Sequence, residues 1–472
     1  MSPSSSWPRT RPFQGRNTGS NPVGDTSSGS APRRPLSRVS RYTIRRHIPA
    51  AGLEGLVAGL FTLNDVVLRK TFGAGPVLIT LMVMAQPVSQ LLAIVWGSLM
   101  EGRRKNGFIL WLGGGGRLLL LPVALAGTAI AFSIPVIASI AMATAIIPAL
   151  NALYQSNYTD VERGRVYGWV LSVTAAATIL GAMGAGALMD VHPSAVRVIY
   201  PVAGILGGVS AFLYFRIRAR GGVARGAEAR GEVARDATAH GALATAAGAT
   251  IAPSPSAPLV ARAAPEWRGD LLRAVRNPFR GSIEIFRADP SFFRFEMAYM
   301  VYGLAYMIVQ PVIPIFLVDE IRVQYSQAAI ARGLIFWGLI SLASPAFGRV
   351  LDRWNAVRVS LIGFAVLALF PLALAASRSV PGVYAAFGIY GLAMSAVSIA
   401  WTMGPILFAK ERDAATYMGV HVTMVGIRGL VGNPLGLVLL QTVGSRAAFF
   451  VASGLFVAAA VMMLRLDRAA RT

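Results

Sequence analysis

The chain has 472 residues, of which 55% are hydrophobic and 14% are charged, so it is too apolar to be a soluble protein of ordinary composition. Its 44 basic and 21 acidic residues give a net charge of +23, but most basic residues lie between apolar runs, which argues against nucleic-acid binding. The sequence contains no cysteine, which excludes disulfides, thiol nucleophiles and zinc-finger sites.

The N-terminal segment is rich in Ser, Pro and Arg, contains a single acid, Asp25, and has no apolar run. Such a composition cannot bury a core, so we expect residues 1–48 to form a disordered tail. No apolar stretch with a small-residue cleavage site precedes the first apolar run, which argues against a secretory signal. The bias toward Arg and Ser leaves an organellar transit peptide as the alternative to a solvated cytoplasmic tail.

Apolar runs follow along the rest of the chain, and most have the length of about 20 residues that a helix needs to cross a bilayer core. The twelve runs lie at residues 50–68, 75–99, 107–127, 130–155, 166–189, 196–215, 295–318, 329–350, 359–377, 381–409, 416–440 and 445–464. They predict an all-α membrane protein with twelve transmembrane helices.

The runs fall into two groups of six, with low-complexity sequence between them. We therefore expect these segments: an N-terminal half over 49–217, a cytoplasmic linker over 218–291, a C-terminal half over 292–466 and a tail over 467–472. Within the linker, Trp267, Leu271, Leu272 and Val275 recur at helical spacing among arginines. That pattern predicts either an interfacial helix on anionic lipid or a short helix packed under the second half.

Basic residues are distributed unequally between the loops. With the N-terminus inside the cell, the short inside loops carry ten basic residues and the outside loops carry six. The tails and the linker, which are also rich in arginine, then fall on the inside as well. By the positive-inside rule we expect a multi-pass protein of the cell (inner) membrane with both termini in the cytoplasm.

Two similar loops follow the second and the eighth apolar run. Each has a glycine, an acid four residues later on the same helix face, and basic residues. The two loops, 251 residues apart, read Gly97-Ser-Leu-Met-Glu101-Gly-Arg103 and Gly348-Arg-Val-Leu-Asp352-Arg353. The same offset relates further glycines and acids, which indicates an internal repeat of two halves.

The second loop resembles the loop signature of the major facilitator superfamily, Gly-x-x-x-Asp-Arg-x-Gly-[Arg/Lys]-[Arg/Lys], whereas the first has Glu101 for the acid and Gly102 in place of the arginine. The resemblance implies two pseudo-symmetric six-helix halves that rock around a site near the midplane. It also implies that Asp352 docks at the start of the fifth helix and Glu101 at the start of the eleventh. The expected cytoplasmic gate comprises Gly97, Glu101, Arg103, Gly348, Asp352, Arg353, Arg163 and Tyr167.

Two arginines lie near the middle of apolar runs, Arg117 in the third and Arg428 in the eleventh. A buried guanidinium stays charged and needs an acidic partner or an anionic ligand. We therefore expect either a role in binding the substrate or the coupling ion, or a permanent ion pair with an acid such as Glu54 or Asp65.

Three acids also lie inside apolar runs, where charged side chains are costly and usually face a cavity or a partner. We expect Glu54 and Glu296 near the cytoplasmic face, either paired with arginines of the loops or protonated during transport. Asp65 and Arg69 are four residues apart, which predicts an interfacial ion pair, with a cation or proton site as the alternative.

Amide and aromatic side chains on common helix faces are candidates to line a path for a polar or amphipathic solute. Interhelical hydrogen bonds are the alternative explanation. These candidates are Asn64, Gln86, Gln90, Asn151, Gln155, Tyr302, Tyr306, Gln310 and Trp401.

No ATP-binding motif, HExxH motif or nucleophile–base set is present, so we expect a gradient-driven transporter without a cofactor or metal rather than an enzyme. The fifth run contains Gly181-Ala-Met-Gly184-Ala-Gly186, which resembles the glycine-rich motif of facilitator-superfamily antiporters without its proline. It favours export of a small amphipathic metabolite or drug. The alternatives are proton-linked uptake of a sugar or organic anion, with a proton or cation as the coupling ion, and a non-transporting sensor or scaffold. We expect a monomer in the lipid bilayer.

Overall fold

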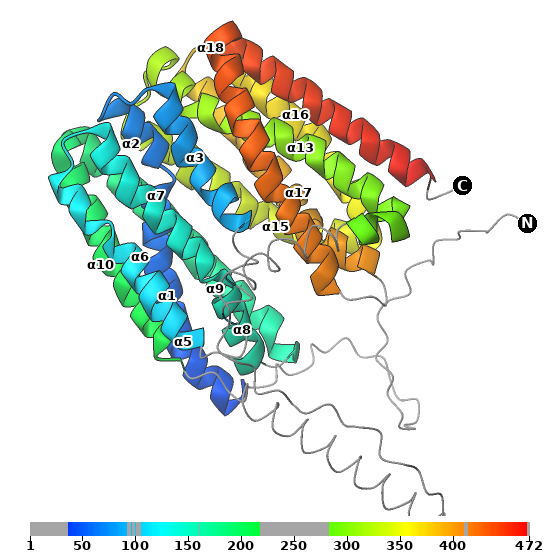
Figure 1. Cartoon of the computed structure of the whole chain (residues 1–472), viewed down its shortest axis with the longest axis horizontal. Helices are drawn as coiled ribbons and strands as arrows, with labels where there is room; N and C mark the ends of the chain where they lie inside the picture. Colours follow the sequence, from blue (N-terminus) through cyan, green and yellow to red (C-terminus); the bar gives the residue numbers. More distant parts are fainter. Residues whose placement is uncertain are drawn as a thin grey trace, which may run out of the picture.

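The computed structural model describes residues 36–91, 96, 100, 105–158, 160–217, 283–409 and 414–469. The described chain is all-helical, and its two halves lie against each other with α3 beside the C-terminal half (Figure 1). The N-terminal half contains α1 (Arg38–Phe61), α2 (Asn64–Lys70), α3 (Pro76–Leu91), α5 (Lys105–Phe108), η1 (Ile109–Gly114), α6 (Gly115–Leu118), η2 (Leu121–Leu125), α7 (Ala129–Ala145), α8 (Ile147–Asn157), α9 (Asp160–Val191), η3 (Pro193–Ala195) and α10 (Val196–Phe215). The C-terminal half contains α13 (Pro290–Ile315), η4 (Phe316–Glu320), α14 (Tyr325–Ala329), η5 (Ile330–Ile335), α15 (Phe336–Arg353), α16 (Ala356–Ala376), α17 (Val380–Ala409) and α18 (Ala414–Ala469).

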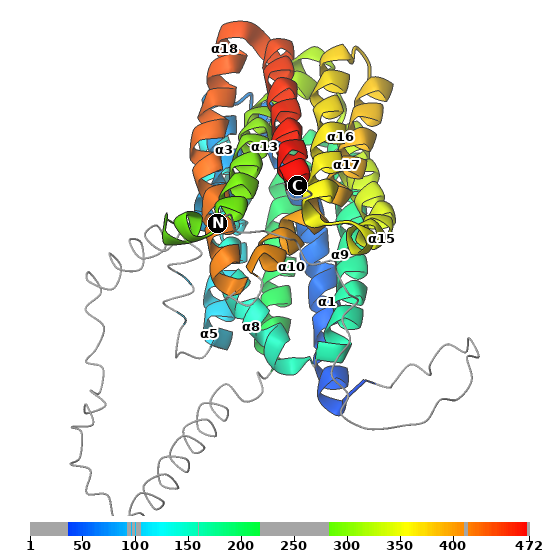
Figure 2. The same ribbon diagram turned by 90° about the vertical axis from the view of Figure 1, so that its right-hand side faces the viewer.

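The expected membrane crossings are present. In the described residues, nine helices are long and apolar enough to cross a membrane, and α3 and α7 are shorter apolar helices. The long α18 consists of two helices that meet at Gly444, where φ is +84°, a conformation that glycine adopts without strain. With α18 counted as two helices, the described residues contain twelve apolar helical segments, as expected of a multi-pass membrane protein, and they run alongside one another (Figure 2).

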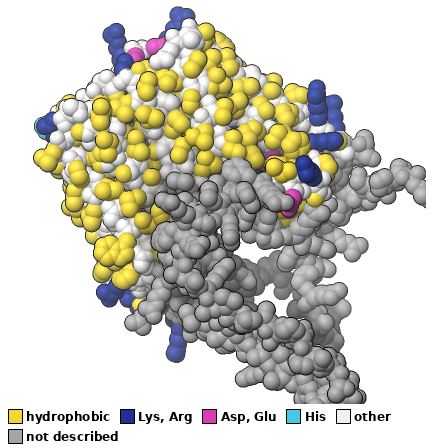
Figure 3. Space-filling model, in the orientation of Figure 1, with side chains coloured by type: hydrophobic (Ala, Val, Ile, Leu, Met, Phe, Trp, Pro, Cys, Tyr) yellow, Lys and Arg dark blue, Asp and Glu magenta, His cyan; other side chains and the backbone are white. Residues whose placement is uncertain are grey.

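The outer surface is largely apolar, as contact with a bilayer requires. Large apolar side chains such as Trp111, Leu125 and Leu342 are 76%, 89% and 79% exposed. Figure 3 shows a broad hydrophobic face between Lys and Arg side chains that gather at the ends of the helices. In water such a face would be unfavourable, so it marks the surface that contacts lipid.

The first helix begins earlier than expected, because α1 starts at Arg38 and residues 38–48 are helical. Its N-terminus is capped by Ser37, whose side chain accepts a hydrogen bond from the backbone N–H of Ser40 at 3.1 Å. The Glu162 carboxylate accepts hydrogen bonds from the Ser37 backbone at 2.6 Å and from the Ser40 hydroxyl at 2.7 Å. This tertiary contact stabilises a helix start whose own composition favours disorder.

Closely packed glycines hold α1 against α9 and α13 against α18. An added Cβ at Gly181 would lie 2.9 Å from the Leu56 Cα, and one at Gly59 would lie 2.6 Å from the Ala182 backbone N. In the other half, a Cβ at Gly436 would lie 3.0 Å from the Ile308 Cα. The glycine motif of the fifth run thus serves helix packing in the described structure.

Substitution of Gly181 by valine is expected to lower the free energy of unfolding by about 1–3 kcal/mol, since overpacking forces the backbones of α1 and α9 apart. Gly184 is the matched control because no heavy atom lies within 4 Å of its added Cβ. Thermal unfolding in detergent checks this. Equal melting temperatures for Gly181→Val and Gly184→Val would contradict the close packing.

Several expected features lie outside the described residues. Gly97, Glu101 and Arg103 are among them, as are the linker residues Trp267, Leu271, Leu272 and Val275. Arg163 and Asp352 lie in α9 and α15, but their side chains are not described. The docking of Asp352 and Glu101 therefore stays a prediction.

Candidate functional site

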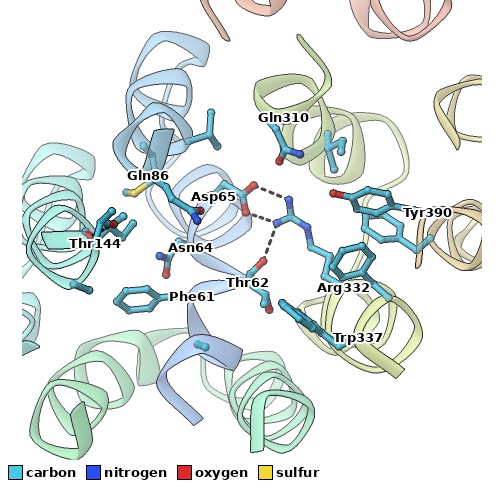
Figure 4. Close-up of a pocket in the computed structure, with 18 of the residues that line it drawn as sticks. Phe61, Thr62, Asn64, Asp65, Gln86, Thr144, Gln310, Arg332, Trp337 and Tyr390 are labelled. Atoms are coloured by element: carbon cyan, nitrogen blue, oxygen red, sulfur yellow. Dashed lines mark hydrogen bonds and ion pairs between the residues drawn. The ribbon is translucent and has the colours of Figure 1, made fainter. Parts of the chain in front are cut away.

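A cavity of about 520 Å³ lies between the two halves, and a second one of about 380 Å³ adjoins it. Both are lined by Val83, Gln86 and Gln310, so they form one central site. The larger cavity is lined from α1, α2, α3 and α7 on one side and from α13, η5, α15 and α17 on the other (Figure 4).

Arg332 links the two halves across the larger cavity. Arg332 projects from the π-helix η5 toward the start of α2 (Figure 4). Both of its terminal nitrogens donate to the Asp65 carboxylate there, and the distance from Nη2 to Oδ2 is 2.8 Å. Its Nη1 also donates to the Thr62 carbonyl at 2.9 Å. This geometry is the bidentate arrangement that makes Arg–carboxylate pairs strong and directional. The π-helix fits the frequent occurrence of such segments at functional sites.

The expected ion pair between Asp65 and Arg69 is wrong. Arg69 instead donates to the Asp319 carboxylate of η4, at 2.9 Å from Nε and 2.6 Å from Nη2. Asp65 turns toward the cavity because a bidentate partner in the other half is available to it. The local i, i+4 spacing does not decide between these partners.

Arg117 lines the same cavity and pairs with Glu54 of α1. Its Nη1 also donates to the Ser139 hydroxyl at 3.4 Å. The side chain lies on Gly207 of α10, where an added Cβ would be 2.6 Å from the Arg117 Cγ. Glu54 thus pairs with an arginine inside the helix bundle rather than with the loop arginines that were expected, and Arg117 has the acidic partner foreseen for it.

Arg428 lines the smaller cavity and is 2% exposed. Its Nη1 donates to the Tyr299 carbonyl at 2.6 Å and its Nε to the Met424 carbonyl at 3.2 Å. It lies on Gly303, whose added Cβ would be 2.6 Å from both Nε and Nη1. Among the described residues no carboxylate forms an ion pair with Arg428, unlike Arg117 and Arg332.

Glu296 is completely buried, and its carboxylate lies against His421 of α18, with 2.6 Å between Oε1 and Nδ1. Of the two alternatives expected for Glu296, pairing with arginines of the loops is wrong, and protonation during transport stays a prediction. The described neighbours of the His421 ring are aromatic, with Trp401 at 5.0 Å and Tyr299 at 5.1 Å between ring centroids. The pair adjoins the smaller cavity through Trp401, which lines it.

Seven of the predicted amide and aromatic candidates line the two cavities. Gln86, Gln90, Tyr302, Tyr306, Gln310 and Trp401 line the smaller cavity, and Asn64 lines the larger one. Asn64 accepts a hydrogen bond from the Tyr200 hydroxyl at 2.6 Å, and the Tyr390 hydroxyl donates to that of Tyr306 at 2.9 Å. The side chains of Asn151 and Gln155 lie outside the described residues.

One end of the site, the closed end, is sealed by contacts between the halves at α2, η4 and α14. Besides Arg69–Asp319, the Asp190 carboxylate accepts from the backbone N–H groups of Tyr325 at 2.7 Å and Ser326 at 2.9 Å. Lys70 donates to the Val323 carbonyl. These contacts join the halves at the ends of α2 and α9 that lie far from the start of α1.

At the other end, the diverging end, the halves separate (Figure 1). The gate residues that can be described there are Gly348 and Arg353 of α15 and Tyr167 of α9, which is 59% exposed. Between the described residues at this end no hydrogen bond or ion pair joins the halves.

Two charged or titratable residues of the site were not singled out in the sequence, Arg332 and His421. Both lie inside apolar runs, so the rule that selected Arg117 and Arg428 applies to them as well. Arg332 stands only three residues after the expected start of its run, so it was not among the arginines near the middle of a run. His421 was overlooked because a single histidine carries little signal.

The lining of the site combines charged, amide and aromatic side chains. Within the described chain no group of three or more His, Asp or Glu side chains could hold a metal ion. Three arginines and one acid, Asp65, are among the lining residues, together with amides and aromatic rings. Such a cavity can hold a small solute and supplies one guanidinium, Arg428, for a negatively charged group.

Comparison with known proteins places this architecture. A family model described as "Major Facilitator Superfamily" matches residues 295–472. The "Probable nitrate transporter NarT" of Staphylococcus epidermidis is 29% identical over 163 residues, which cover 33% of this chain and 40% of that relative. The chain thus matches well under half the length of this relative.

Solved structures share the fold at low sequence identity. A POT family transporter in complex with 5-aminolevulinic acid has a TM-score of 0.63 and 10% identity, with 92% of this chain and 97% of that chain covered. The nucleoside transporter NupG has a TM-score of 0.61 and 13% identity, with 91% and 100% covered. These likenesses extend over both halves.

Proposed function

We propose that this chain, a secondary transporter that belongs to the Major Facilitator Superfamily, carries a substrate whose anionic group binds at Arg428. The observation behind the proposal is a buried guanidinium that lines the cavity without a carboxylate in ion-pair contact among the described residues. Burial of an unpaired charge is costly, so an anionic ligand that completes the pair gains much of that free energy on binding.

The lining narrows the class of substrate to small monoanions. Arg117 and Arg332 are already neutralised by Glu54 and Asp65, which leaves one positive charge for the ligand. Nitrate is the first test ligand because the relative in Staphylococcus epidermidis is named as a probable nitrate transporter. The cavities of about 520 and 380 Å³ also have room for a small carboxylate.

Transport would proceed by alternating access of the two halves around this site. With both termini in the cytoplasm, as the positive-inside rule predicts, the diverging end faces the cytoplasm and the structure is inward-open. In the opposite state Asp352 and Glu101 would close the cytoplasmic side, while the contacts of Arg69 and Asp190 would break.

Export of an amphipathic metabolite or drug is the second candidate. It is favoured by the apolar wall of the larger cavity, to which Phe336, Trp337 and Phe387 contribute. An aromatic monocarboxylate would satisfy both the apolar wall and Arg428. Benzoate is therefore the second test ligand.

Flux into proteoliposomes tests the proposal. Purified protein is reconstituted, and uptake of nitrate and of benzoate is compared with that of benzamide, a neutral compound of the same shape as benzoate. We expect saturable uptake of at least one of the two anions and none of benzamide. Saturable benzamide uptake without anion uptake would overturn anion recognition and support the second candidate.

A further inference from the structure

The buried pair of Glu296 and His421 lines neither cavity, yet it lies beside the site at Arg428. Both side chains are completely buried, and Oε1 and Nδ1 are 2.6 Å apart. The remaining polar atoms, Glu296 Oε2 and His421 Nε2, are buried and have no hydrogen-bond partner among the described residues. Such unsatisfied atoms are rare in folded proteins and call for an explanation.

The pair is connected to Arg428 through two helices. On α13, Arg428 donates to the carbonyl of Tyr299, and Tyr299 follows Glu296 by one helical turn. On α18, Arg428 itself follows His421 by two turns. A change of charge at the pair is therefore felt at Arg428, in surroundings where charges are weakly screened.

Few other groups can compensate such a change. On α13 the neighbouring titratable groups are Tyr299 and Tyr302, and on α18 Tyr417, whose hydroxyl donates to Asp289 at 3.3 Å. The groups that α16 and α17 present are Phe364 against Tyr299 and Trp401 against His421, which do not titrate. Within the described chain, the charge of this region is thus set by Glu296, His421 and Arg428.

The charge balance has two states. With Glu296 ionised and His421 neutral, the carboxylate offsets the charge of Arg428, and the region is neutral. One additional proton, on Glu296 Oε2 or on His421 Nε2, makes the pair neutral and leaves the region with a charge of +1. Only the second state attracts a monoanion, and the bound anion then returns the region to neutrality.

We propose that the Glu296–His421 pair is a proton-binding site, and that one proton there and one monoanion at Arg428 bind cooperatively. The inference rests on the proposed function and adds the coupling ion to it. By linkage, the anion must raise the affinity for the proton by the same factor by which the proton raises the affinity for the anion. A transporter with this site moves the two together.

Anion affinity as a function of pH tests the coupling in the full-length protein. The dissociation constants of nitrate and benzoate are measured by calorimetry from about pH 5.5 to 8.5, the range in which histidine-containing sites commonly titrate. For the wild type we expect affinity to fall by about fivefold to 150-fold toward alkaline pH, the usual range of coupling between sites. In weakly buffered solution, anion binding should also take up protons, up to one for each anion.

The Glu296→Gln variant gives the decisive comparison because glutamine keeps the shape of the protonated acid and has no negative charge. Its anion affinity at alkaline pH should equal that of the wild type at acid pH, without proton uptake. A merely structural role predicts weaker binding instead. His47→Gln is the matched control. His47 is also buried, at 2% exposed, but it lies in the N-terminal half, where it bonds to Tyr158.

The outcomes separate the coupling from the function on which it rests. Anion binding that does not depend on pH in the wild type overturns the proton site and leaves anion recognition intact. Absence of binding by nitrate and benzoate at every pH overturns both. Loss of pH dependence in Glu296→Gln, with tight binding and an unchanged His47→Gln, supports the proposal.

Discussion

Replacement of Arg428 by glutamine is expected to weaken monoanion binding by about 30-fold or more. Loss of one member of a buried, hydrogen-bonded charge pair costs about 2–5 kcal/mol, and each 1.4 kcal/mol is a factor of about ten. The guanidinium lines the cavity and donates to the Tyr299 and Met424 carbonyls. Glutamine retains a donor but not the charge. Calorimetric titration with nitrate and benzoate gives the affinity directly.

The same substitution should lower the stability of the protein less than the loss of an ion-paired arginine does, because among the described residues no carboxylate is in ion-pair contact with Arg428. This separates a ligand-binding arginine from a structural one. Arg358→Gln is the matched control, because Arg358 donates to Asp467 at 2.8 Å within the C-terminal half and does not line either cavity. It should lose some stability and retain anion affinity.

A second variant keeps the charge and moves it. An added Cβ at Gly303 would meet both Nε and Nη1 of Arg428 at 2.6 Å, so Gly303→Ala must displace the guanidinium. We expect weaker anion binding than in the wild type and stronger binding than in Arg428→Gln. Unchanged dissociation constants in both variants would show that the anionic group binds elsewhere.

The helices could be predicted from the sequence because the signal is local. A run of about 20 apolar residues is sufficient to identify a membrane helix, and the two-half arrangement follows from the repeat of the loops at Gly97 and Gly348. The start of α1 could not be predicted in this way, since it depends on Glu162, which is distant in the sequence and accepts from Ser37 and Ser40. The π-helix at Arg332 likewise has no signature in composition.

The candidate site was predicted in part. Burial of a charge inside an apolar run identified Arg117 and Arg428, because the cost of burial is a property of the residue itself. The ion-pair partners of the buried charged residues were harder to predict, because each pair depends on which helices pack against each other. Asp65 bonds to Arg332, 267 residues away, and Glu296 to His421, 125 residues away. Pairs this far apart in the sequence cannot be predicted from local residue spacing.

Replacement of Asp65 by asparagine is expected to open the closed end. Its bidentate bond to Arg332 joins the halves where both side chains are nearly buried, at 9% and 12% exposed. Removal of one partner of a buried ion pair costs about 3–5 kcal/mol, because the other charge stays behind unpaired. The pair joins the halves in the state with a closed end and we expect it to break when that end opens, so the population should shift toward the opposite state by about 100-fold or more.

Spin labels can measure this shift without a prior cysteine-free variant, because the chain contains no cysteine. Ser194 of η3 and Ser379, before α17, are exposed residues on opposite halves at the closed end. Labelled cysteines at both positions should give one short distance in the wild type. In Asp65→Asn a longer distance should become dominant.

The control substitution is Asp467→Asn, because Asp467 is an equally buried acid, at 3% exposed, whose bond to Arg358 lies within one half. Its distance distribution should match that of the wild type. A short distance in Asp65→Asn would show that Arg69–Asp319 and the Asp190 contacts hold the closed end by themselves.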